Sequence, residues 1–144
     1  MKIKKMGEKL FVKLEIGDEI GESLKKACIE HQVRAGSVSG IGACDVVELG
    51  YFEPEGKDYR VEKVEGNFEL LNLKGNISML KGKSGEVEPF AHLHIMLGKE
   101  DYSIIGGHMV SARISITGEI VVDIADGEIV RERDEEKGVN LWRL

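Results

Sequence analysis

The chain has 144 residues and a formal net charge of −6 at pH 7. This length suits one compact domain with its own core, so we expect residues 1–144 to form a single domain. DNA-binding modules usually cluster Lys and Arg; here basic residues are scattered among acidic ones, which argues against direct DNA binding. No apolar run approaches the roughly 20 residues that span a bilayer, so the sequence predicts a cytoplasmic protein with no membrane contact.

The first part of the chain predicts one strand and one helix. Residues 10–16 alternate between apolar and charged side chains, the pattern of a half-buried strand. Gly17 interrupts this pattern, and Asp18 is the expected N-cap of a helix over about residues 18–32. Apolar side chains recur there at helical spacing on one face: Ile20, Leu24, Ala27 and Cys28.

The rest of the chain predicts short strands separated by glycine-rich turns. The expected strands are residues 35–41, 44–52, 59–64, 67–73, 76–80, 91–98, 108–117 and 119–124. We interpret residues 42–43 as a tight turn and the charge run 131–137 as a solvated turn or tail. Val139, Leu141 and Trp142 after it are expected to dock onto the domain or onto a neighbouring subunit. The predicted fold class is α+β: a mainly antiparallel sheet with one principal helix.

Two cysteines, Cys28 and Cys44, lie in apolar surroundings without a CxxC spacing. This pattern predicts two reduced, buried thiols rather than a disulfide or a catalytic thiol, because no neighbouring residue would activate a thiolate.

Three of the four histidines fall in a short window, and their spacing predicts a cluster. His92 and His94 are two apart on a predicted strand, so both rings face the same side of the sheet. A hairpin with a turn at residues 99–101 would pair Gly98 with Tyr102. That register places His92 opposite His108 and Gly106 opposite His94, with directly opposed Cβ atoms about 4.5–5.5 Å apart. Gly106 and Gly107 would then leave space beside His94.

Three imidazoles on one patch are a typical ligand set for a divalent metal, and zinc bound by three histidines keeps an open fourth position. Iron, nickel and manganese also accept imidazole ligands. The fourth ligand, or a general base, could be water or a carboxylate such as Glu69 or Glu88, and no spacing selects between them. The remaining His31 lies near the helix end, where a cation complements the helix dipole.

Several motifs resemble the PPC ("plants and prokaryotes conserved") domain family. They are GSVSGIGA at 36–43, GNFELL at 66–71, LKGN at 73–76, HLH at 92–94, GGH at 106–108 and TGEI at 117–120. They occur in the family's order and cover nearly the whole chain, as in its stand-alone prokaryotic and archaeal members. The resemblance implies an α/β fold with a mainly antiparallel sheet and a homotrimeric assembly. It also implies a metal site at His92, His94 and His108 like that of some prokaryotic members.

The plant members carry AT-hooks and contact transcription factors, and the prokaryotic ones are often labelled DNA-binding. This chain has no Arg-Gly-Arg-Pro motif, and the plant element Gly-Arg-Phe-Glu is replaced by GNFE at 66–69, without its basic residue. The leading hypothesis is therefore a non-enzymatic homotrimeric regulatory module that holds zinc at the histidines and contacts other proteins. The alternatives are a metal-dependent enzyme using a zinc-bound water and a DNA-binding regulator.

Overall fold

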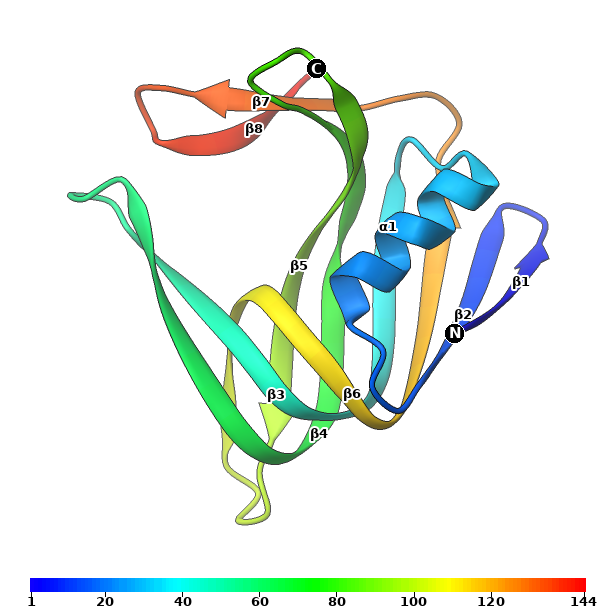
Figure 1. Ribbon diagram of the computed structural model, residues 1–144, viewed down its shortest axis with the longest axis vertical. Helices are drawn as coiled ribbons and strands as arrows, with labels where there is room; N and C mark the ends of the chain where they lie inside the picture. The colour runs from blue at the N-terminus through cyan, green and yellow to red at the C-terminus, as the bar shows by residue number, and fades with distance from the viewer.

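The structure is a computed structural model that describes residues 1–144. It contains eight strands and one helix (Figure 1). In chain order these are β1 (Lys2–Met6), β2 (Lys9–Glu15), α1 (Ile20–His31), β3 (Gly36–Glu53), β4 (Asp58–Lys81), β5 (Val87–Gly98), β6 (Ile104–Ile124), β7 (Val130–Asp134) and β8 (Val139–Arg143). The sheet-dominated architecture with a single helix agrees with the predicted mainly antiparallel fold.

The strands form one sheet in the order β1-β2-β6-β3-β4-β7-β8, and β5 pairs with both β4 and β6. The pairings of β3, β4, β5 and β6 therefore close into a circuit. All pairs are antiparallel except β4 with β7. Figure 1 shows how the long strands β3, β4 and β6 curve across the molecule, so that one strand takes part in several pairings along its length.

The long strands correct the prediction of many short ones. Residues 42–43 are not a turn, because β3 runs through them and only its register shifts, between Gly40 and Gly42 and again between Cys44 and Val46. A Cβ at Gly42 would lie 2.3 Å from the carbonyl oxygen of Thr117 on β6, so only glycine permits this close approach. Bulges bend a strand without ending it, and in the sequence they are hard to distinguish from turns.

The predicted helix is present, with bounds slightly inside those expected and a different cap. Glu19, not Asp18, is the N-cap: its carboxylate accepts a hydrogen bond from the backbone N–H of Glu22 at 2.6 Å. The Asp18 carboxylate accepts from the Glu15 N–H at the end of β2 instead. The helix ends at His31, and the C-cap residue Gln32 adopts the left-handed conformation with φ 56°.

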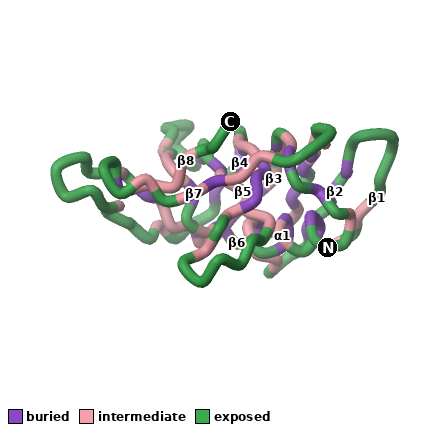
Figure 2. The backbone as a smooth tube through the Cα atoms, turned by 90° about the horizontal axis from the view of Figure 1, so that it is seen from above, coloured by how far each residue is buried: buried purple, intermediate pink, exposed green.

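The buried face of α1 packs against the sheet and completes an apolar core with β2, β5 and β6. Figure 2 shows the buried residues gathered in the middle of the molecule, with the hairpin ends exposed. Both Cys28 and Cys44 are free and buried in this core, as predicted.

The single helix, of 12 residues, lacks the length and apolar character needed to span a bilayer.

The C-terminal charge run is a solvated turn, as predicted, only at residues 135–137, which are exposed. Residues 131–134 belong instead to β7, which pairs in parallel with β4 through Met79 and Leu80 and in antiparallel fashion with β8. Within this run Arg131 is only 6% exposed. The turn before β8 reaches the end of the β3–β4 hairpin, because a Cβ at Gly138 would lie 2.7 Å from the Lys57 Cβ. Val139, Leu141 and Trp142 do return to the domain as predicted, as part of β8.

Candidate metal centre

The β5–β6 hairpin brings the three histidines together, although the predicted register is wrong by two residues. His94, not His92, lies opposite His108, and Gly98 pairs with Ile104. The turn covers residues 99–103 rather than 99–101, because Tyr102 adopts a left-handed conformation and the Lys99 N–H donates to the Ser103 carbonyl. A shift of two residues keeps every side chain on its face, so the cluster survives the error.

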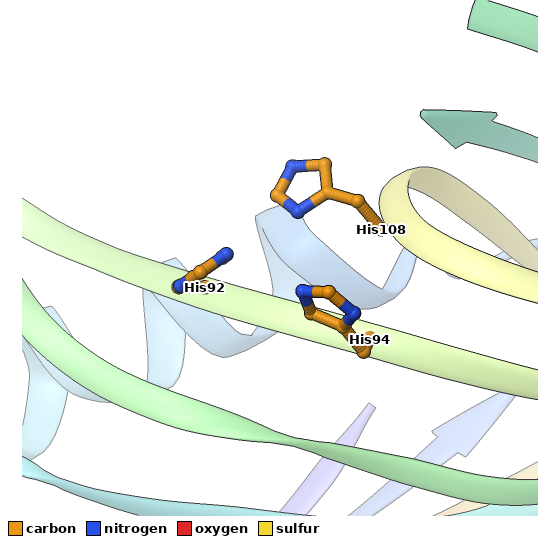
Figure 3. Close-up of side chains that lie close together, drawn as sticks. All are labelled: His92, His94 and His108. Carbon is orange, nitrogen blue, oxygen red and sulfur yellow. The ribbon is translucent and has the colours of Figure 1, made fainter. Parts of the chain in front are cut away.

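The three rings converge on one point of the sheet surface (Figure 3). Ring centroids are 5.4 Å apart for His92 and His94, 5.1 Å for His92 and His108, and 5.4 Å for His94 and His108. One ring nitrogen from each lies within 4.8 Å of the others. This separation is close enough for one ion to be shared among the three imidazoles.

An unpaired ring nitrogen is a second reason why these residues suit a transition-metal ion. His108 Nδ1 is buried and has no hydrogen-bond partner. Buried polar atoms without a partner are rare in proteins and call for an explanation such as a bound ion. Imidazole nitrogens are ligands for zinc, copper, iron and nickel, so the residues present suit such an ion.

The electrostatic environment keeps two of the rings neutral at pH 7. Burial lowers the pKa of His92 to about 4, helped by the positive charge of Arg131 and by the other two imidazoles. Burial also lowers the pKa of His108, with contributions from His94 and Arg131. Metal ions bind the neutral imidazole, so protons compete weakly for these two rings.

Glycines give the site its room, but not where the sequence suggested. Gly106 lies opposite Met96 rather than His94. Space beside His108 comes instead from Gly50 on β3, where a Cβ would lie 3.3 Å from the His108 ring and 2.9 Å from that of Tyr59. On β4, a Cβ at Gly75 would lie 2.0 Å from the His92 carbonyl oxygen.

The two carboxylates suggested as a fourth ligand or base do not join the histidine group. Glu88 is exposed and pairs with Lys25 of the helix at 2.8 Å. Glu69, also exposed, pairs across β4 and β5 with Gly98 and lines a different hollow, beside Ile41 and Ile116. Glu88 lies four residues before His92 on β5, and the partner of Glu69, Gly98, lies four residues after His94, so each carboxylate is about 13 Å along the strand from the nearest histidine.

The histidines open onto a cleft of about 670 Å³ that sequence reasoning missed. His92 and His108 line it together with Arg131 and with three aromatic side chains, Phe52, Tyr59 and Phe90. The Tyr59 ring stacks on His108 at a centroid distance of 4.8 Å. The sequence does contain a signal that Arg131 belongs to a strand. Apolar Ile129 and Val130 come before it, and apolar residues alternate again from Val139, after a Lys-Gly turn, which is the pattern of a hairpin.

The fold and site together define a class of small antiparallel-sheet domains with a histidine cluster on the sheet surface. Residues 1–126 match the Plants and Prokaryotes Conserved domain, which is written PCC or PPC. The chain therefore belongs to this family, as its motifs predicted.

Three solved structures share the fold over nearly their whole length. A candidate DNA-binding protein from Bacteroides thetaiotaomicron is 34% identical, with 99% of this chain and 96% of that one covered and a TM-score of 0.89. A PPC protein from Pyrococcus horikoshii is 27% identical, with 99% and 94% covered and a TM-score of 0.84. A metal-containing protein from Archaeoglobus fulgidus is 28% identical, with 100% and 99% covered and a TM-score of 0.84. No curated protein matches the chain.

Proposed function

We propose that the chain is a homotrimeric module that binds one divalent metal ion, zinc, through His92, His94 and His108 and acts in regulation through contacts with other proteins. The observation that carries the proposal is the convergence of three ring nitrogens within 4.8 Å. The similar protein from Archaeoglobus fulgidus is described as metal-containing, which supports a metal in this fold. Three imidazole ligands favour zinc, because zinc is most often four-coordinate and commonly binds three protein ligands with a water in the fourth position.

Elemental analysis of the purified protein, followed by zinc titration calorimetry, tests the metal site. We expect about one zinc per chain, and a loss of affinity of about 100-fold or more in His92→Ala, since even residues that only orient a ligand contribute about 10–100-fold. His31→Ala is the matched control, because His31 lies at the end of α1 outside the cluster. Equal zinc affinity in wild type and His92→Ala would remove the proposed site.

An exposed apolar patch supports the trimer. It consists of Ile41, Leu71, Tyr102, Ile104 and Ile116, which line two adjoining hollows and are 46–94% exposed. Contiguous apolar surface of this kind marks interfaces in soluble proteins. Light scattering should give three times the 15.9 kDa of one chain, and Ile116→Glu should lower this mass. Ile29→Glu, on the exposed face of α1, should not, and a monomeric wild type would refute the assembly.

A metal-dependent enzyme is the second candidate, and the cleft beside the histidines favours it. A bound zinc would supply Lewis-acid chemistry, while the cleft's own aromatic and charged residues would bind and orient a substrate. Zinc-stimulated hydrolysis of activated esters or phosphate esters that disappears in His94→Ala would support this candidate. Equal background rates in wild type and His94→Ala would oppose it.

We expect no direct DNA binding, despite the description of the Bacteroides thetaiotaomicron protein. The net charge of −6 opposes association with a polyanion, because affinity for DNA derives largely from Lys and Arg contacts that release counterions. A gel-shift measurement with duplex DNA at low salt should show no complex. A complex that weakens steeply as salt is added would contradict this expectation.

A further inference from the structure

Arg131 is a buried cation without an ionic partner. Its side chain extends from β7, and the residue is 6% exposed. The guanidinium donates to three neutral acceptors: Ser78 Oγ at 3.3 Å, the Asn140 carbonyl oxygen at 2.8 Å and Asn76 Oδ1 at 3.3 Å. No carboxylate lies within ion-pair distance of it, whereas four exposed arginines each pair with one: Arg34, Arg60, Arg113 and Arg143.

A buried charge without a counter-charge destabilises a fold strongly, because the cost of removing it from water is not offset by an ion pair, so the absence of a partner needs a reason. Three hydrogen bonds occupy three of the five N–H donors of a guanidinium, which leaves donors on both terminal nitrogens free. The rings of Phe90 and Trp142 lie on the guanidinium, each with its centroid 5.9 Å from the central carbon. These contacts fix the group in position with donors to spare.

Arg131 belongs to the same cleft as the histidines. Arg131, His92 and His108 all line it. The positive charge of Arg131 reaches the rings, since it contributes to the lowered pKa of both histidines. Cations also outnumber carboxylates around the cleft, in a chain whose net charge is negative: Lys57, Arg131, Arg133 and Lys137 against Asp58 and Glu136.

We propose that Arg131 is the anion-binding residue of this cleft and holds the carboxylate or phosphate group of a small molecule lying between Arg131 and the histidine cluster. The planar fork of an arginine matches both oxyanions and binds them through charge-assisted hydrogen bonds. The aromatic side chains of Phe52, Tyr59 and Phe90 supply an apolar surface for the body of the molecule. A second contact, from the oxyanion to the metal, rests on the proposed function; the contact with Arg131 does not.

The test is calorimetry with four probes, on metal-free and on zinc-loaded protein. Inorganic phosphate, phenyl phosphate and benzoate carry an oxyanion, and benzamide is the neutral isostere of benzoate. We expect at least one oxyanion probe to bind metal-free wild type, to bind more tightly with zinc, and to exceed benzamide in affinity. Arg131→Gln should lower oxyanion affinity about tenfold or more, Arg131→Lys should lower it less, and the exposed Arg143→Gln should leave it unchanged. Comparing phenyl phosphate with benzoate then distinguishes a phosphate ligand from a carboxylate.

Two readouts on the wild type keep the inference open to refutation if the Arg131 variants fail to fold. Trp142 is the only tryptophan and lies on Arg131, so its fluorescence should change as phosphate binds. The Arg131 Nε–H resonance should shift in the NMR spectrum. Oxyanion affinity unchanged in a folded Arg131→Gln, or no binding of any probe to wild type, would overturn the inference.

The outcomes also separate this inference from the proposed metal site. Zinc binding with no oxyanion binding would refute only the role of Arg131. Arg131-dependent oxyanion binding without zinc binding would refute only the metal site.

Discussion

Alternate side chains of β5 lie in two contrasting environments. Leu93, Ile95 and Leu97 point into the core and are at most 2% exposed. His92 and His94 alternate with these residues and point to the opposite face, where His108 Nδ1 has no hydrogen-bond partner and Arg131 has no counter-ion. The chain itself completes the first face, whereas the second face has polar groups left without a partner. We therefore expect stability and the proposed ligand binding to depend on opposite faces of one strand, so that substitutions separate them.

The largest effect on stability should come from the core face. Leu93→Ala removes a buried side chain and leaves a cavity, so we expect the free energy of unfolding to fall by about 2–5 kcal/mol in urea denaturation. His94→Ala, one residue away on the exposed face, should change it by no more than about 0.5 kcal/mol in metal-free protein. Comparable losses in the two variants would contradict the division between faces.

A close contact between strands should link the two faces. At Gly75 the added Cβ of alanine would lie 2.0 Å from the His92 carbonyl oxygen, so β5 must move. We expect Gly75→Ala to lower the free energy of unfolding by about 1–3 kcal/mol and to weaken zinc binding as well. Gly56→Ala is the matched control, because its Cβ would meet nothing nearer than 4.0 Å. Normal zinc affinity in a destabilised Gly75→Ala would show that the site does not depend on this contact.

The histidine face should make metal-free protein sensitive to mild acid. The folded-state pKa of His92 is about 4, below the 6.5 of an ordinary histidine, mainly because the ring is buried. Between these values the unfolded chain binds the proton more readily, so the free energy of unfolding falls as the pH drops from 6.5 towards 4. Urea denaturation at pH 7.5 and pH 5 should show this loss, and His92→Gln should reduce it. A pH dependence identical in His92→Gln would exclude His92 as the cause.

The smallest effect should be the reaction of the two cysteines with a thiol reagent in the folded protein. It tests whether the core is closed to small molecules from solvent. Burial raises the pKa of the Cys28 thiol to about 12, and burial together with the charge of Asp45 raises that of Cys44 to about 12. The native protein should therefore not react with a thiol reagent at pH 8, whereas two thiols should react in urea. Rapid reaction of the folded protein would reveal an opening into the core.

Local patterns in the sequence predicted the elements that local interactions determine. Alternation in residues 10–16 gave β2, and helical spacing gave α1 within two residues of its observed limits. The continuity of β3 and β4 was not predictable in this way, because their glycines serve close approaches between strands distant in sequence, as at Gly42 and Thr117.

The candidate site shows the same limit at finer scale. The spacing of two residues was enough to place His92 and His94 on one face. The predicted register with β6 was wrong by two residues, an even number, so His108 still lies on the same face as the other two histidines. The pairing itself depended on the left-handed residue Tyr102, which the sequence does not indicate. The sequence around Arg131 has the pattern of a hairpin, but only the fold reveals that this hairpin lies beside β4 and that Arg131 is buried there.

The hairpin of β7 and β8 contributes residues to the cleft from outside the region that matches the family. The family domain covers residues 1–126 and includes all three histidines, whereas Arg131 and Trp142 come after it. The lining of the cleft thus comes partly from the region that matches the family and partly from the hairpin that follows it. Exchanging the C-terminal hairpin between relatives would retain the histidines while replacing Arg131 and the other hairpin residues that line the cleft, so proteins that share the histidine cluster can differ in this part of the cleft.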